Sequence, residues 1–211
     1  GTAPDDALEQ AQRILADHLS SVLVTNTVPI VMGGGHEVAW PSFQGLAQYL
    51  FSQSNQASTQ QQEAQSQPKI GIINFDSHFD LRHEPIASSG TPFLQIAKYC
   101  HEHDWPFHYA CLGVSEFANT RALYDRAESL NVWWENDEAM HWSQLERIQS
   151  RLSAYIESVD YLYLTVCMDV FPASNCPGVS APATRGVELP VVETLIDQIC
   201  QSNKLVLTDI A

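Results

Sequence analysis

Short apolar runs alternate with amphipathic segments along most of the sequence. The apolar runs predict strands at 29–32, 69–75, 108–114, 132–134, 161–168 and 204–208. The amphipathic segments predict helices at 5–24, 41–51, 93–103, 119–129, 142–158 and 191–202. Strands that are apolar on both sides, separated by helices, are typical of a parallel sheet covered on both faces. We therefore predict an α/β fold with a mainly parallel sheet.

The chain has 211 residues and no internal repeat, so we expect a single domain over 1–211. A polar, low-complexity stretch at 52–68 is interpreted as a solvated loop or as an extension of the helix before it. The last strand delivers Asp209 to the sheet edge just before the sequence stops at Ala211. We therefore expect this chain to be part of a longer protein.

Composition argues against several kinds of partner. The 25 acidic and 10 basic residues give a net charge of −15, which should repel phosphate backbones, so no nucleic-acid partner is expected. No apolar run approaches the ~20 residues of a membrane helix, so no membrane partner is expected either. The first residues lack the pattern of a signal peptide. The five cysteines include no CxxC pair, which favours reduced thiols and a cytoplasmic protein.

The segment IGIINFDSHFDLR, residues 70–82, ends an apolar strand with Asp76, His78 and Asp80. Alternate residues of an extended segment point the same way, so these three side chains can converge. Carboxylates that lie close together raise each other's pKa unless a cation lies between them, and a divalent metal is the simplest such cation. The alternative is a solvated strand end, with Asp80 paired to Arg82 and His78 in a hydrogen bond.

Other candidate ligands follow other predicted strands. His36 comes after the first strand and three glycines that relax the backbone, whereas Cys167 and Asp169 come at the end of YLYLTVCMD. Taken alone, His36 is an ordinary loop histidine and Asp169 a helix cap or turn residue. Because sites in parallel sheets collect beyond the carboxyl ends of the strands, their shared position favours a metal site.

Five sequence blocks, in order, resemble the arginase/agmatinase ureohydrolases. They are GGGHE at 33–37, NFDSHFDLR at 74–82, SSGTPF at 88–93, TVCMDVFPASNCPGVSAPATRG at 165–186 and LTDIA at 207–211. Their details are most similar to the formimidoylglutamase branch. The resemblance implies an arginase-like three-layer sandwich that is truncated here at both ends. It also implies a cytoplasmic enzyme that acts on a small-molecule substrate, in a family whose members commonly form homo-oligomers.

The resemblance also implies a site with two Mn²⁺ ions. Carried over by position, the metal ligands are His36, Asp76, His78, Asp80, Cys167 and Asp169. The implied reaction is hydrolysis of N-formimidoyl-L-glutamate to L-glutamate and formamide, a step in histidine breakdown, by a metal-bound hydroxide. No side chain is assigned as catalytic beyond these ligands.

Further residues are candidates for substrate binding. Arg185 could hold a substrate carboxylate, or it could form a surface salt bridge. Ser88, Ser89 and Thr91 could line the pocket, although Ser-Gly-Thr-Pro is equally good turn chemistry.

Two departures from the pattern define the alternatives. Cys167 stands where the family has a bridging aspartate, which allows Zn²⁺, partial loading, or a non-catalytic relative in which Cys167 is only a buried thiol. Ser89 stands where agmatinases and arginases place a histidine, so an agmatinase or guanidinobutyrase is the less favoured enzyme.

Overall fold

The structure, a computed structural model, describes residues 4–58 and 67–211. Within these residues it contains one six-stranded sheet in the order β1-β6-β5-β2-β3-β4, and every neighbouring pair is parallel. The strands are β1 (Ile30–Met32), β2 (Ile70–Phe75), β3 (His108–Val114), β4 (Trp133–Asn136), β5 (Tyr161–Val166) and β6 (Leu205–Ile210). The predicted α/β class with a parallel sheet is therefore confirmed.

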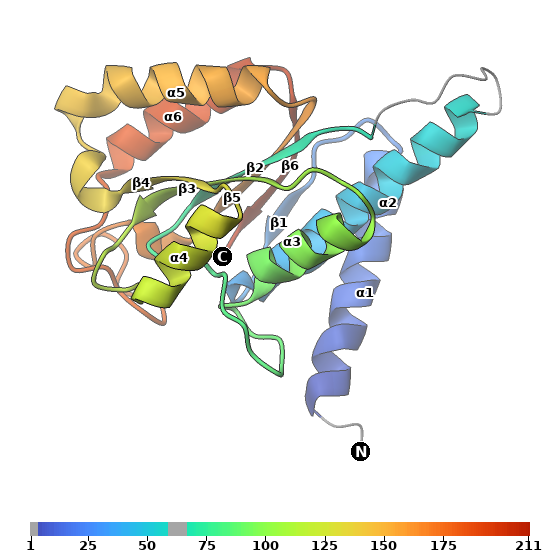
Figure 1. Cartoon of the computed structure of the whole chain (residues 1–211), viewed down its shortest axis with the longest axis horizontal. Coiled ribbons are helices and arrows are strands. Elements are labelled where there is room, and N and C mark those ends of the chain that lie inside the picture. The colour runs from blue at the N-terminus through green and yellow to red at the C-terminus, as the bar shows by residue number, and fades with distance from the viewer. Residues whose placement is uncertain (1–3, 59–66) are drawn as a thin grey trace.

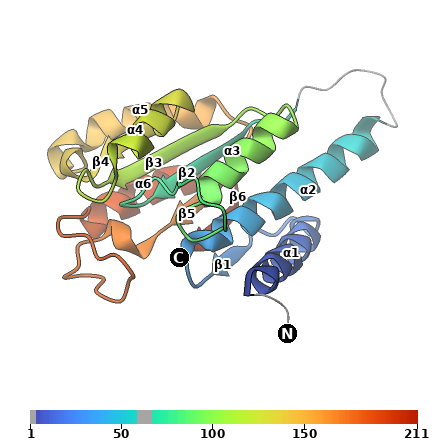
Figure 2. The same cartoon turned by 60° about the horizontal axis from the view of Figure 1, so that its bottom comes forward.

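Helices cover both faces of the sheet, which makes three layers (Figure 1). The helices are α1 (Pro4–Leu23), α2 (Ala39–Ser58), α3 (Pro92–Glu102), α4 (Arg121–Ser129), α5 (Leu145–Glu157) and α6 (Leu189–Gln201). One face packs against α1 to α4, and the other against α5 and α6. Figure 2 shows α1 lying along α2, on the outside of the layer. No described helix is both long enough and apolar enough to span a membrane.

Strand β2 shows why the sequence runs are continuously apolar. All six of its residues are buried. Ile70 and Ile72 face the core beneath α1 to α4, whereas Ile73 and Phe75 belong to the core beneath α5 and α6. A central strand with helices on both faces must be apolar on both sides, so it shows no polar alternation.

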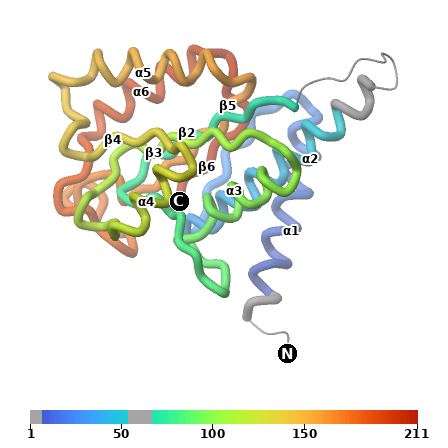
Figure 3. Tube along the Cα trace, in the orientation of Figure 1, coloured from blue at the N-terminus to red at the C-terminus, as the bar shows by residue number. Residues whose placement is uncertain are grey.

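The chain changes direction within the sheet between β2 and β5. From β2 it continues through β3 to β4 on one side, and from β5 it continues to β6 on the other. The loop after β2 leads to α3 on one face, and the loop after β5 leads to α6 on the opposite face. These loops diverge and leave a crevice at the carboxyl ends of the two strands, which is where open α/β sheets bind ligands. In Figure 3 the C-terminal end of the chain lies in the middle of the molecule, at this edge.

The structure shifts some predicted boundaries. Helix α2 continues to Ser58, so the first part of the polar stretch 52–68 is helical, as one interpretation of it allowed. Residues 59–66 of that stretch lie outside the described residues. Strand β6 runs to Ile210, two residues beyond the predicted end, and carries Asp209 within the sheet.

An ion-pair cluster joins β4 to α5. The Glu135 carboxylate, only 5 % exposed, accepts hydrogen bonds from both terminal nitrogens of Arg147 at 3.0 and 2.9 Å. The Arg151 guanidinium and the Trp133 indole N–H also donate to it. Burial would raise the pKa of Glu135, but Arg147, Trp133 and Arg151 together lower it.

We predict that Glu135→Gln lowers the free energy of unfolding by about 1–2 kcal/mol at pH 7, because two half-exposed arginines lose their carboxylate. A depressed folded-state pKa stabilises above the unfolded value of about 4.3, so the difference should shrink as the pH falls below about 4. Urea denaturation across pH measures it. Glu157→Gln, on the exposed end of α5, is the control and should change stability by less than about 0.5 kcal/mol. An equal, pH-independent loss in both variants would contradict the account.

Candidate metal centre

Neighbouring strand ends bring the first two candidate ligands together. Phe75 pairs with Val166 in the sheet, so Asp76 and Cys167 are the next residues of adjacent strands. Both backbones continue the ladder briefly, since Asp76 N–H donates to Leu112 O and Cys167 N–H to Phe75 O. Asp76 is completely buried. Parallel register therefore fixes these side chains at one point of the sheet edge.

The segment after β2 is a turn, which differs from the extended segment predicted for it. The Asp76 carboxylate accepts the His78 backbone N–H at 2.6 Å, an interaction typical of Asx turns. Asp80 adopts a left-handed conformation with φ 47°, which aspartate tolerates better than most residues. Asp76, His78 and Asp80 thus converge because the chain curls around the Asp76 carboxylate, and not because they alternate along a strand.

His36 forms one half of the centre with two carboxylates. Its Nδ1 lies 2.8 Å from Asp76 Oδ2 and 2.9 Å from Asp80 Oδ2. This Nδ1 is buried and, among the described residues, has no hydrogen-bond partner of good geometry. Its Nε2 lies 2.9 Å from Thr165 Oγ1. An orphaned ring nitrogen beside two carboxylates, held from behind by a hydroxyl, is the arrangement that a metal-ligating imidazole adopts.

His78 forms the other half. Its Nδ1 lies 3.0 Å from Asp169 Oδ2 and 3.4 Å from Asp76 Oδ1. Asp169 is buried in the short turn η4 (Met168–Val170), where its carboxylate accepts the Ser77 backbone N–H at 3.3 Å. The Ser77 hydroxyl donates to the Asp169 carbonyl at 2.7 Å, which ties the two loops together.

The donor atoms form two groups that share Asp76. His36, Asp76 and Cys167 make one group, and Asp76, His78 and Asp169 make the other. Within each group the donor atoms all lie within 4.8 Å of one another. Asp80 adds a carboxylate to the first group through its approach to His36. Nitrogen and oxygen donors of this kind fit divalent cations of the Mn²⁺ and Zn²⁺ type, and a carboxylate shared by two groups fits a two-metal centre.

The pKa values of the candidate ligands indicate that positive charge stabilises this site. Burial raises the pKa of Asp80 to about 6, and the negative charge of Asp76 acts in the same direction. Burial would lower the pKa of His78, but Asp169 and Asp76 raise it to about 10. Without metal, therefore, a protonated imidazole supplies the cation that these carboxylates need. A metal must displace that proton, so metal and protons compete for the site.

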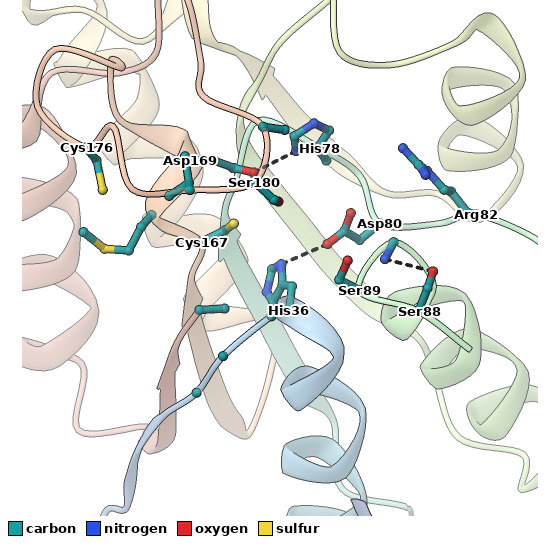
Figure 4. Close-up of a pocket in the computed structure, with 18 of the residues that line it drawn as sticks. His36, His78, Asp80, Arg82, Ser88, Ser89, Cys167, Asp169, Cys176 and Ser180 are labelled. Carbon is teal, nitrogen blue, oxygen red and sulfur yellow. Dashed lines mark hydrogen bonds and ion pairs between the residues drawn. The ribbon is translucent and has the colours of Figure 1, made fainter. Parts of the chain in front are cut away.

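A cavity of about 750 Å³ opens above the centre. Its lining includes five of the six candidate ligands, namely His36, His78, Asp80, Cys167 and Asp169. Figure 4 shows these side chains on the cavity floor, with Arg82, Ser88 and Ser89 along one wall. The centre is therefore open to a small molecule from one side.

Not every predicted substrate-binding residue reaches this cavity. Ser88 and Ser89 line it, whereas Thr91 is buried beneath, where its hydroxyl accepts the Ser88 backbone N–H at 3.0 Å. Arg185 is exposed and pairs with Glu138 at 3.1 Å. The structure thus places Arg185 in the surface salt bridge and Thr91 in the turn, the second alternative for each.

Two features were missed by sequence reasoning. Arg82, considered there only as a partner for Asp80, lines the cavity and lies 3.7 Å from Glu84 instead. Thr165 holds His36 from behind; its position two residues before Cys167 on β5, facing the same way, was the available signal. The role of Gly33 also differs from backbone relaxation alone, because an added Cβ there would lie 2.6 Å from Val38 Cγ1.

The sequence profile of the arginase family matches residues 2–211. The chain belongs to the arginase family. It is 48 % identical over 210 residues to a curated formimidoylglutamase of Ralstonia nicotianae, and 47 % identical over 214 residues to one of Vibrio parahaemolyticus. These alignments cover 100 % and 98 % of this chain but 62 % and 60 % of the relatives, so the chain spans about three fifths of their length.

Solved structures of arginase-family proteins share the fold. The chain superposes on formimidoylglutamase from Bacillus subtilis with a TM-score of 0.78 at 21 % identity, covering 96 % of this chain and 58 % of that one. It superposes on a formiminoglutamase of Trypanosoma cruzi, solved with Mn²⁺, with a TM-score of 0.78 at 19 % identity, covering 100 % and 64 %. The expected arginase-like sandwich is thereby confirmed.

We predict unequal effects when ligands are removed from this arginase-family centre. Asp76→Ala should abolish binding of both cations, because both donor groups lose a member. Asp169→Ala should abolish binding of only the cation next to His78. The loss of affinity for that cation should exceed the ~10–100-fold loss seen when a residue that only supports a ligand is removed. Elemental analysis after Mn²⁺ loading and desalting measures both. Arg185→Ala is a surface control that should load fully, and two tightly held cations in Asp76→Ala would contradict the shared role of Asp76.

Proposed function

We propose that this chain carries the catalytic centre of a metal-dependent hydrolase that converts N-formimidoyl-L-glutamate to L-glutamate and formamide. The observation that carries the proposal is the buried Asp76 carboxylate, which two donor groups share, and the other members of both groups line an open cavity. The identity of close to one half with curated formimidoylglutamases supports the substrate class.

Two divalent cations, with Mn²⁺ the expected metal, would be held by the six candidate ligands. When bound, such cations supply a water of lowered pKa and polarise the group that it attacks. The chain's own residues keep that water and the substrate in place. Asp76 and Asp80 fix the side of the centre next to His36, and Thr165 keeps the His36 ring in orientation.

The proposed reaction breaks one carbon–nitrogen bond. Water oxygen adds to the formimidoyl carbon, and the bond from that carbon to the glutamate nitrogen breaks. One water proton passes to this nitrogen and the other to the imino nitrogen, which becomes the amide nitrogen of formamide. Asp80 lines the cavity beside His36, where its carboxylate would help to hold a cation.

The cavity wall suits an anionic substrate. Among the described residues that line it, Arg82 carries the only guanidinium or ammonium group. Its backbone is fixed beside the serine loop, because Arg82 N–H donates to Gly90 O at 2.9 Å and Gly90 leaves room for the arginine side chain. We assign Arg82, in place of Arg185, to a substrate carboxylate, with Ser88 and Ser89 beside it.

The five free cysteines favour a reducing compartment, in line with a cytoplasmic enzyme.

Formamide release tests the proposal directly. The protein in its full-length form, loaded with Mn²⁺, should release formamide and glutamate from N-formimidoyl-L-glutamate, and Asp76→Ala should not. The same preparation should release no urea from agmatine or 4-guanidinobutyrate, since Ser89 replaces the histidine expected of those enzymes. Urea without formamide would establish the alternative activity. Metal-replete protein that hydrolyses none of the three would establish a non-catalytic relative.

We predict that Arg82→Ala lowers kcat/KM for N-formimidoyl-L-glutamate roughly 10–100-fold, mostly through KM. A hydrogen bond to a charged group contributes about 1.5–3 kcal/mol, and each 1.4 kcal/mol is about tenfold. Arg185→Ala is the matched control and should leave the kinetic constants unchanged, because its guanidinium contacts Glu138 outside the cavity. Steady-state kinetics of both variants measures this difference. A loss of kcat/KM in Arg185→Ala and not in Arg82→Ala would assign the substrate carboxylate to Arg185.

A further inference from the structure

We infer that the two halves of the centre prefer different metals, with the half containing Cys167 selecting Zn²⁺ and the half containing His78 selecting Mn²⁺. This inference rests on the proposed metal-dependent function and names the cation for each half of the same site. It starts from the place of the Cys167 sulfur.

The sulfur belongs to one donor group and not to the other. Cys167 lies with His36 and Asp76, whereas the second group consists of Asp76, His78 and Asp169. The aspartate that the family has at this position carries two oxygens and can reach both metals. A thiol offers a single donor atom, and the Cys167 sulfur is grouped with His36 and Asp76 but not with His78 and Asp169, so we assign it to the first half alone. The substitution therefore makes the centre asymmetric.

The first half carries the donors of a zinc site. The imidazole of His36, the carboxylates of Asp76 and Asp80, and the Cys167 sulfur give one nitrogen, two oxygens and one sulfur. Four donors drawn from Cys, His and Asp are what tetrahedral Zn²⁺ binds in proteins. Mn²⁺ prefers carboxylate, carbonyl and water oxygens over sulfur, so it is the poorer match here.

The second half keeps the donors of a manganese site. His78 and the carboxylates of Asp76 and Asp169 supply nitrogen and oxygen alone. The nearby cavity leaves room for water or substrate to complete six-fold coordination. His78, Asp169 and Ser77 are tied into one loop pair, so this half does not depend on Cys167 for its shape.

Charge balance also permits a thiol in the first half. Coordination replaces the thiol proton by the metal, so a metal-bound Cys167 carries one negative charge, as an aspartate would. The total charge of the ligand set is then the same as in an all-carboxylate centre. What changes is the softness of one donor, which alters metal preference and leaves the number of sites at two.

Co²⁺ is the probe that reports this sulfur, because a thiolate bound to Co²⁺ gives a sulfur-to-metal charge-transfer band in the near ultraviolet. We expect the Co²⁺-loaded protein to show the band and Cys167→Ser to lose it. Cys176→Ser is the matched control, since Cys176 lines the same cavity but belongs to neither donor group. Figure 4 shows Cys176 on a separate loop from Cys167. Circular dichroism and thermal unfolding establish that each variant is folded, with Cys167→Ala as a second variant.

Competitive loading then assigns the metals. Zn²⁺ binds most sites more tightly than Mn²⁺, so Zn²⁺-loaded protein is titrated with increasing Mn²⁺. One Zn²⁺ per chain should be displaced at a low excess of Mn²⁺ while the other is retained, and Cys167→Asp should lose the retained Zn²⁺ at a lower excess than the wild type does. A wild-type protein without the Co²⁺ band, or a band lost only in Cys176→Ser, would overturn the inference. So would a wild-type protein that loses both Zn²⁺ ions at the same excess of Mn²⁺, or one that retains Zn²⁺ no better than Cys167→Asp does. Because none of these readouts uses turnover, formamide release can fail while the metal assignment stands, and the reverse.

Discussion

Crowded negative charge at the carboxyl edge of the sheet is the constraint on which the rest of the structure depends. Asp76, Asp80 and Asp169 converge there, and Asp76 and Asp169 are buried. Carboxylates removed from water at this spacing repel one another strongly unless cations lie between them. Without metal, the protonated imidazoles of His36 and His78 supply part of this positive charge, and the neighbouring carboxylates raise the pKa values of both histidines. Divalent cations would supply this charge more completely.

The fold brings these charges together because the strand order changes direction between β2 and β5. Two loops that leave adjacent strand ends in opposite directions expose the ends of both strands. The loop after β2 supplies His78 and Asp80, and the loop after β5 supplies Cys167 and Asp169. The short 3-10 helix His36–Val38, which follows β1, adds His36. A rigid, fully apolar pair of central strands then holds the ligands in register, while the loops above are free to differ between enzymes of the family.

The parallel sheet and the meeting of the candidate ligands at its edge could be predicted from the sequence, because apolar runs and the polar residues that end them are local signals. The course of the chain beyond the strands could not. The turn at Asp80 depends on a hydrogen bond between Asp76 and His78, and no periodicity reveals it. Nor could the sequence show that Arg82 lines the cavity whereas Arg185 pairs with Glu138, because the path of the long loop after β5 decides where Arg185 lies.

The most direct test of the central claim is a crystal structure of the protein grown with Mn²⁺ and Zn²⁺, with anomalous-difference maps recorded on either side of each metal's absorption edge. The account predicts two peaks, one on each side of the Asp76 carboxylate, with His36 bound to the first and His78 to the second. Side chains turned apart into solvent, with no anomalous peak between them, would contradict it.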